Sequence, residues 1–87
     1  MPSHPTPIRF QRLLLTGAAG GLGRELRTRL KAYCTTLRLS DIANLGGEGA
    51  GEELRPARLE DAGAVLGLLE GVDAVVHLGG VSTEQPW

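Results

Sequence analysis

Three glycines spaced three residues apart, Gly17, Gly20 and Gly23, are the residues of this chain best suited to binding chemistry. They follow the apolar run at 13–15 and precede a charged, amphipathic segment, which is the order strand, turn and helix. Glycines in such a turn permit a tight bend, close approach of a diphosphate to the backbone, and close packing of the helix on the strand. The amides at the helix start then bind the anion. The spacing is not Gly-x-Gly-x-x-Gly, so a turn that serves packing alone remains the alternative.

An acidic residue, Asp41, stands 24 positions after Gly17 and closes a predicted strand. A carboxylate at that place can accept hydrogen bonds from both hydroxyls of an adenosine ribose, and it repels a 2′-phosphate. The pattern therefore predicts NAD rather than NADP as the cofactor. Arg24 and Arg38 are the cations that would hold a 2′-phosphate if that prediction were wrong. Capping of a turn is the alternative role for Asp41.

No other group of residues indicates catalysis or a metal. His77 has no second His, Cys or acidic residue at ligand spacing, so no metal site is predicted. Tyr33 is not followed by a lysine four residues on, and Ser82 has no base near it in the sequence. Cys34 is the only cysteine, which excludes an internal disulfide. No catalytic residue is assigned in these 87 residues.

The predicted elements alternate between strand and helix. Leu22, Leu26 and Leu30 form an apolar stripe that extends to Tyr33. The alternation predicts an α/β fold, a Rossmann-type doubly wound parallel sheet with strand order 3-2-1-4. Pro56 has no N–H for a ladder and favours an edge position for the third strand. The strands are expected at about 11–16, 35–40, 54–59 and 73–78, and the helices at about 21–33 and from Asp61 to Gly71.

Residues 1–9 are predicted to be a flexible leader, and residues 10–87 the N-terminal part of a single NAD-binding Rossmann domain. The strand at 73–78 is apolar but would lie at the open edge of the sheet, where an unpaired strand is prone to associate. We therefore expect an incomplete, truncated domain. A net charge of −1 gives no reason to expect nucleic acid as a partner, and no apolar run is long enough for a membrane. These features favour a soluble cytoplasmic protein.

The string Thr16-Gly-Ala-Ala-Gly-Gly-Leu-Gly23 with Asp41 resembles the extended short-chain dehydrogenase/reductase group, also called the NAD-dependent epimerase/dehydratase family. A narrower resemblance, to the members that oxidise uronic acids, depends on Leu37-Arg-Leu-Ser-Asp41 and above all on His77-Leu-Gly-Gly-Val-Ser-Thr-Glu-Gln-Pro86. It implies oxidation of C1 of galacturonate or glucuronate by hydride transfer to NAD, which gives an aldarolactone. We expect a homo-oligomer at full length.

The resemblance also implies roles for individual residues. Ser82 would bind the sugar acid beside the nicotinamide. Arg58 departs from the family pattern, because an aspartate that contacts the adenine amino group usually stands there. The residues implied to bind the cofactor are Gly17, Gly20, Gly21, Leu22, Gly23, Asp41, Leu59, Leu78, Gly79 and Gly80.

The catalytic Ser, Tyr and Lys of the family lie further along the chain than the strand at 73–78, and none is present here. The Tyr would act as the general base and the Lys would lower its pKa. Two alternatives therefore remain open: epimerisation or dehydration of a nucleotide sugar by an enzyme of the same family, and dinucleotide sensing without catalysis.

Overall fold

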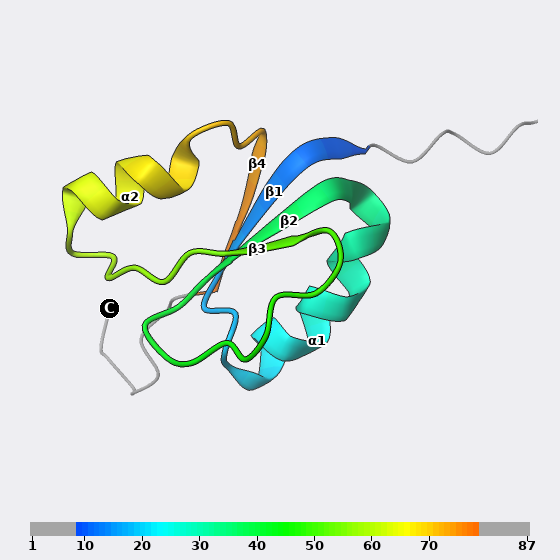
Figure 1. Cartoon of the computed structure of the whole chain (residues 1–87), viewed down its shortest axis with the longest axis horizontal. Coiled ribbons are helices and arrows are strands. Elements are labelled where there is room, and N and C mark those ends of the chain that lie inside the picture. The colour runs from blue at the N-terminus through cyan, green and yellow to red at the C-terminus, as the bar shows by residue number, and fades with distance from the viewer. Residues whose placement is uncertain (1–8, 79–87) are drawn as a thin grey trace, which may run out of the picture.

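The computed structural model of the chain describes residues 9–78, so most of the predicted leader lies outside the described part. One sheet of four parallel strands has the order β3-β2-β1-β4, which confirms the predicted Rossmann-type topology. The two α-helices lie on opposite faces of this sheet (Figure 1). In chain order the elements are β1 (Phe10–Thr16), α1 (Gly21–Leu30), the 3₁₀ turn η1 (Lys31–Tyr33), β2 (Cys34–Ser40), β3 (Glu52–Leu54), α2 (Ala62–Leu69) and β4 (Ala74–His77).

The hydrophobic core lies between the sheet and α1. β1 and β2 each have a strand on both sides, so their leucines are shielded from water. Side chains alternate between the two faces of a strand, and every second residue of each strand therefore faces α1. Leu26 and Leu30 of α1 pack against this layer. The buried members of the core are Leu13, Leu15, Ala18, Cys34, Leu37 and Leu39.

The third strand differs from its prediction in position but not in its place in the sheet. β3 comprises Glu52–Leu54 rather than 54–59, so Pro56 lies after the strand. The ladder begins early because the amide of Leu37 donates to Gly51 O at 2.8 Å, and it ends where Arg55 N donates to Leu39 O at 2.9 Å. The edge position of the third strand is confirmed. The predicted reason is wrong, because Pro56 lies outside the strand.

The predicted stripe on the first helix is wrong at both ends. Leu22 is 61% exposed, whereas Gly23, the next residue in the first turn of α1, is buried. Tyr33 is half-exposed, since α1 ends at Leu30 and continues as a 3₁₀ turn. The tighter winding of three residues per turn rotates later side chains away from the α-helical stripe.

The second helix begins and ends as predicted. Asp61 Oδ1 accepts a hydrogen bond from Ala64 N at 3.1 Å, which is an N-cap, and Gly71 after the helix has a φ of 74°. Leu68 is buried, whereas Leu66 is 71% exposed. Neither helix in the described part of the chain is long and apolar enough to cross a membrane.

Candidate functional site

The glycine-rich turn has the backbone geometry that its spacing suggested. Gly17 has a φ of 70°, which favours glycine, and it turns the chain out of β1. A Cβ on Gly23 would lie 2.3 Å from Gly17 O and 2.7 Å from two backbone atoms of Ala18, so no larger residue fits there without a shift. Gly23 therefore sets how closely α1 approaches the end of β1.

The start of α1 can receive an anion. Gly20 is its N-cap, and no side chain caps the first amides. A Cβ on Gly20 would make only an ordinary contact of 3.6 Å with Gly17 O, and one on Gly21 would meet nothing within 4 Å. Packing within the chain does not require glycine at these two places. Uncapped amides at the positive end of a helix dipole, with no side chain over them, fit a phosphate group.

Asp41 connects the end of β2 to this turn. Its Oδ2 accepts a hydrogen bond from Ala19 N at 3.0 Å, and its Oδ1 accepts one from Ala43 N at 3.0 Å. Burial raises the pKa of Asp41, but the amides of Ala43, Ala19 and Ile42 outweigh it, and the pKa is lower than the ordinary value. The carboxylate is therefore ionised at neutral pH beside the glycine-rich turn.

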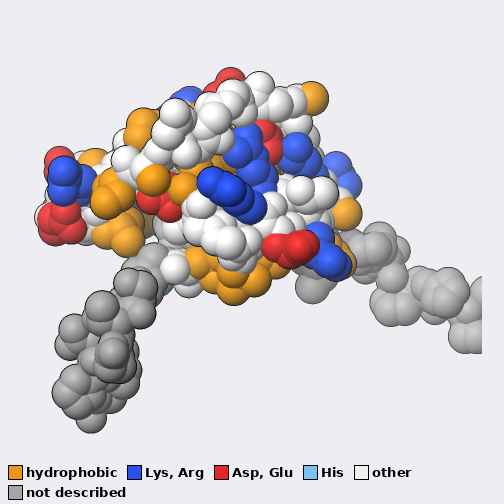
Figure 2. Space-filling view, turned by 90° about the horizontal axis from the view of Figure 1, so that it is seen from below, with side chains coloured by type: hydrophobic (Ala, Val, Ile, Leu, Met, Phe, Trp, Pro, Cys, Tyr) orange, Lys and Arg blue, Asp and Glu red, His pale blue; other side chains and the backbone are white. Residues whose placement is uncertain are grey.

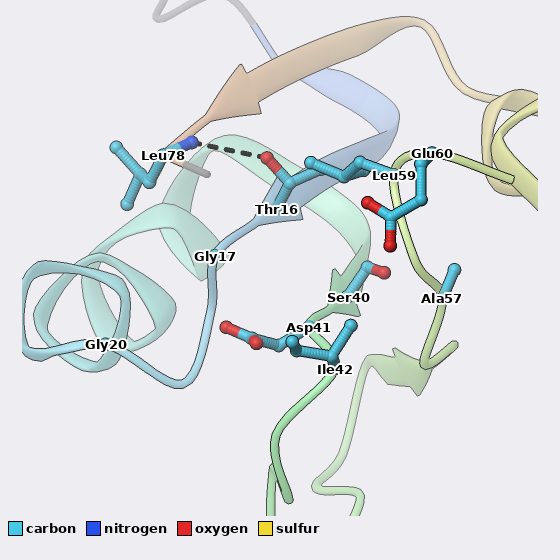
Figure 3. Close-up of a pocket in the computed structure, with 10 residues that line it drawn as sticks. All are labelled: Thr16, Gly17, Gly20, Ser40, Asp41, Ile42, Ala57, Leu59, Glu60 and Leu78. Carbon is cyan, nitrogen blue, oxygen red and sulfur yellow. Dashed lines mark hydrogen bonds between the residues drawn. The ribbon is translucent and has the colours of Figure 1, made fainter. Parts of the chain in front are cut away.

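A cavity of about 350 Å³ opens beside Asp41, at the carboxyl ends of the strands (Figure 3). This is the edge of an open α/β sheet at which ligands bind. Its volume is within the range of small-molecule sites. The residues that line it are Thr16, Gly17, Gly20, Ser40, Asp41, Ile42, Ala57, Leu59, Glu60 and Leu78.

The cavity brings together half of the predicted cofactor residues. Gly17, Gly20, Asp41, Leu59 and Leu78 line it, although they are spread over 62 positions of the chain. Gly21, Leu22 and Gly23 belong to the first turn of α1 and do not line it. The predicted residues Gly79, Gly80 and Ser82 lie outside the described residues.

Five lining residues were missed by the analysis of the sequence. Ser40 carried a usable signal, because it immediately precedes Asp41 at the carboxyl end of a strand. Thr16 had the same signal at the end of β1. Ile42, Ala57 and Glu60 had none, because they lie in loops whose path the sequence pattern does not fix. Arg58 does not line the cavity. It forms an ion pair of 3.6 Å with Glu60, which does line it.

Thr16 also fixes the end of β4. Its Oγ1 lies 2.6 Å from His77 Nδ1, and Leu78 N donates to the same hydroxyl at 3.2 Å (Figure 3). These contacts place Leu78 at the cavity. Within residues 9–78, no group of three or more His, Cys, Asp or Glu side chains is arranged to hold a metal ion.

The two arginines considered for a 2′-phosphate have different surroundings. Arg38 is buried on the face of the sheet that α2 covers, where it bonds to Glu53 and to carbonyls of α2, so it is not available to a nucleotide. Arg24 lines a second hollow with Ala19 and Arg27. Of these two arginines, only Arg24 could still meet a phosphate, and Ala19, which lines the same hollow, donates its amide to Asp41 Oδ2.

The glycine-rich loop after Asp41 is held to α1 by one arginine. Arg27 Nη1 donates to Leu45 O at 2.7 Å, and Nη2 donates to Gly47 O at 2.8 Å. The same guanidinium forms a two-pronged ion pair with Glu52 of β3. Figure 2 shows Lys and Arg side chains close to Asp and Glu side chains on one face of the molecule, with hydrophobic side chains beside them.

The chain has a Rossmann-type fold: a parallel sheet, a glycine-rich turn before the first helix, and an acid at the end of the second strand, with a cavity beside them. No protein-family model matches the chain. Curated relatives and solved structures do match it.

The curated relatives are uronate dehydrogenases. The chain is 54% identical over 86 residues to the one from Pseudomonas syringae pv. tomato, and this match covers 98% of the chain and 31% of the relative. It is 58% identical over 80 residues to the one from Pseudomonas putida, and that match covers 91% of the chain and 30% of the relative. Among solved structures, uronate dehydrogenase from Agrobacterium tumefaciens, in a variant complexed with NAD, matches with a TM-score of 0.83 and 48% identity over 88% of this chain and 29% of that one.

The chain is thus related to the uronate dehydrogenases, and it spans about 30% of the length of these relatives. A short-chain dehydrogenase/reductase superfamily protein with bound NAD is a more distant structural match, with a TM-score of 0.71 and 34% identity over 87% of this chain and 22% of that one. The comparisons confirm the resemblance to the members of the family that oxidise uronic acids.

Proposed function

We propose that this chain is the NAD-binding portion of an oxidoreductase that oxidises C1 of a uronic acid, galacturonate or glucuronate, to an aldarolactone. The observation that supports it most is the position of Asp41, ionised and hydrogen-bonded to the glycine-rich turn, at the rim of a cavity at the carboxyl edge of the sheet. The identity to uronate dehydrogenases across almost the whole chain supports the choice of reaction.

The residues present fit a dinucleotide. The uncapped amides of α1 and the open space at Gly20 and Gly21 suit its diphosphate, with Leu22 and Gly23 in the same turn. The carboxylate of Asp41 suits the hydroxyls of the adenosine ribose, and Leu59 and Leu78 suit the adenosine.

NAD, when bound, would accept the hydride from C1 of the sugar. This chain would hold the cofactor and orient it, with Gly79 and Gly80 among the cofactor-binding residues, and Ser82 would hold the sugar acid. The proton transfer falls to groups that these residues do not include.

The experiment is to measure dissociation constants of NAD and NADP for the full-length protein and for Asp41→Ala. We expect the wild type to prefer NAD. We expect the variant to bind NAD about tenfold to a hundredfold more weakly, because charge-assisted hydrogen bonds to the ribose are lost. NADP binding should weaken less or improve, since the repulsion is removed.

A general loss of folding in Asp41→Ala would weaken the binding of NAD and of NADP equally. The ratio of the two dissociation constants therefore separates such a loss from the loss of the contact to the ribose. Equal affinity of the wild type for NAD and NADP would contradict the role of Asp41. The reaction itself is tested by formation of NADH from galacturonate and glucuronate. Activity on a nucleotide sugar with none on a uronate would support the epimerase or dehydratase alternative.

We further propose that the full-length protein is a cytoplasmic homo-oligomer whose partners are NAD and the sugar acid, with no nucleic acid or membrane. Exposed apolar side chains on α2 and β4, such as Leu66 and Val75, support an association surface. The sequence holds one cysteine, Cys34, so no internal disulfide can form, as is usual where thiols stay reduced. Light scattering of the full-length protein tests the assembly, and a monomer would contradict it.

A further inference from the structure

The loop that follows Asp41 has little backbone support of its own. Residues 42–48 lie outside every helix and strand, and within the described range 9–78 no hydrogen bond between two backbone groups reaches them. Gly46, which has a φ of 78°, and Gly47 add conformational freedom. Ordering such a segment costs backbone entropy, so it keeps one conformation only where other groups hold it.

One side chain of α1 holds this loop. Arg27 donates to the carbonyl oxygens of Leu45 and Gly47, at 2.7 and 2.8 Å. Its Nε and Nη2 also donate to the two carboxylate oxygens of Glu52, at 2.8 and 2.6 Å, and the Glu52 side chain is only 1% exposed. A guanidinium is a rigid planar fork, so the buried carboxylate that fixes its plane also fixes where its other N–H groups point. Arg27 therefore fixes the position of the loop relative to α1.

The loop in turn orients the acid of the predicted ribose site. Asp41 Oδ1 accepts a hydrogen bond from Ala43 N in the loop, and Oδ2 accepts one from Ala19 N in the glycine-rich turn, both at 3.0 Å. The loop carbonyl of Leu45, which Arg27 holds, is only two residues beyond Ala43. Figure 3 shows the Asp41 carboxylate turned toward the glycine-rich turn. A displaced loop would withdraw one of the two amides and allow the carboxylate to rotate.

We propose that Arg27 is a positioning residue that sets the selectivity for NAD over NADP through this loop and Asp41. The inference rests on the proposed function, because it assigns Asp41 to the ribose. Arg27 does not line the cavity beside Asp41, and each of its three guanidinium nitrogens already donates within the chain. Without its hold on the loop, the carboxylate would no longer be kept in place to accept from both ribose hydroxyls or to repel a 2′-phosphate.

The test measures the dissociation constants of NAD and NADP for the full-length protein and for Arg27→Lys. Lysine keeps a positive charge beside Glu52 but cannot donate to two carbonyls and a carboxylate in one plane. We expect NAD to bind about threefold to tenfold more weakly, as for one lost hydrogen bond, and NADP to bind no more weakly than to the wild type. Arg29→Lys is the matched control, because this side chain of α1 is 72% exposed, and the ratio of the two constants should not change.

A double-mutant cycle tests whether Arg27 acts through Asp41. In the Asp41→Ala background, Arg27→Lys should leave the ratio of the two dissociation constants unchanged, because the carboxylate that Arg27 positions is gone. An equal fall in the preference for NAD in both backgrounds would overturn the inference. Weaker binding of NADP alone by Arg27→Lys would also overturn it, since that result indicates direct contact of Arg27 with the 2′-phosphate.

A destabilised variant separates positioning from general stability. Arg38→Met removes donors to the end of α2, on the face of the sheet opposite to α1, and should lower the unfolding temperature without changing the ratio of the two constants. If Arg38→Met reduces the preference for NAD as much as Arg27→Lys does, the ratio reports stability alone and the role of Arg27 is overturned.

Asn44→Ala tests the loop without a change in α1. Asn44 is exposed, and its Oδ1 accepts a hydrogen bond from Gly46 N at 2.8 Å, between the two carbonyls that Arg27 holds. The variant should reduce the preference for NAD in the same direction as Arg27→Lys. If Arg27→Lys does not fold, Asn44→Ala provides the test, and an unchanged ratio would overturn the inference.

The outcomes for Arg27 and for the proposed function differ. If the wild type prefers NAD and Arg27→Lys keeps that preference, the role of Arg27 is overturned and the proposed function stands. If the wild type does not bind NAD at all, the proposed function fails, and this inference fails with it.

Discussion

The two faces of the sheet are built from different chemistry. On the face toward α1, leucines of neighbouring strands pair in register, as Leu13 does with Leu37 and Leu15 with Leu39, and all four are buried. On the face toward α2, β1 and β2 instead carry arginines and hydroxyls among fewer leucines. Two leucines of α1, Leu26 and Leu30, pack on the apolar core, whereas the C-terminal end of α2 accepts hydrogen bonds from a buried arginine of β2.

A buried guanidinium fastens α2. Arg38 Nη1 donates to the carbonyls of Leu68 at 2.8 Å and Glu70 at 2.9 Å, which are at the C-terminal end of α2. Its Nε donates to Glu53, which Arg12 also holds. Burial raises the pKa of Glu53, but the bonds from the two arginines outweigh it and keep the pKa lower than usual. A cation at a helix C-terminus also meets the negative end of the dipole.

The difference between the two faces shows that polar side chains reach the cavity from the face toward α2. Apolar packing on the α1 side holds the strands and the glycine-rich turn without directional partners. The polar row on the other side continues to the carboxyl edge, where Ser40 and Thr16 meet the cavity. Stability and ligand recognition are thus assigned largely to opposite faces of one small sheet.

The largest expected effect comes from the apolar face. Leu37→Ala should lower the free energy of unfolding by about 3–5 kcal/mol, because Leu37 is fully buried and the truncation leaves a cavity. Urea unfolding at low and high salt checks this, and the loss should not depend on salt. Arg29→Ala, at an exposed position on α1, is the control and should change stability by less than about 0.5 kcal/mol. Similar losses in both variants would break the comparison.

Acid should act through Glu52, the buried glutamate of β3 that pairs with Arg27 of α1. Arg27 foremost, then Lys31 and the amide of Gly49, lower the pKa of Glu52 from 4.5 to about 2, against the opposing effect of burial. The stability that this ionised group contributes is complete above its unfolded pKa of 4.5 and is lost as the pH falls toward 2. The loss should be about 2–3 kcal/mol.

Unfolding of the wild type and of Glu52→Gln as a function of pH measures this term. The variant should be less stable at pH 7, and its stability should fall less steeply between pH 4.5 and pH 2. Other carboxylates titrate in the same range, so the difference between the two proteins carries the test. Parallel curves for the two proteins would show that Glu52 is not the group responsible.

The smallest effect is expected on the polar face. Arg38→Met keeps the apolar stem of the side chain but removes the donors to the end of α2, at a cost of about 1–2 kcal/mol. Hydrogen exchange should show the loss as faster opening of α2, with β1 and β2 unchanged. The effect should shrink at high salt, since part of it is electrostatic. Equal destabilisation of α1 and α2 would mean that the two faces are not independent.

Much of the fold could be predicted because its signals are local. The runs of leucine, the acid at Asp61 and the glycines at 17 and 71 each depend on a few neighbouring residues, and the strand order follows from the alternation of elements and the handedness of the crossovers. Predictions failed where contacts between distant parts of the chain, rather than the local sequence pattern, decided the structure. Leu22 fits a helical period but is 61% exposed, and β3 begins at Glu52 because the ladder to β2 already starts where Leu37 N donates to Gly51 O.

The sequence by itself determined the strand, turn and helix around Gly17, Gly20 and Gly23, and it determined Asp41 as the acid that follows. Periodicity and glycine placement suffice for these, because they act within a few residues. Only the tertiary structure decided that Arg38 fastens α2, and that Ser40 and Glu60 share a cavity. Parallel crossovers bring together residues that are 20 or more positions apart, and no short-range pattern in the sequence encodes which side chains meet there.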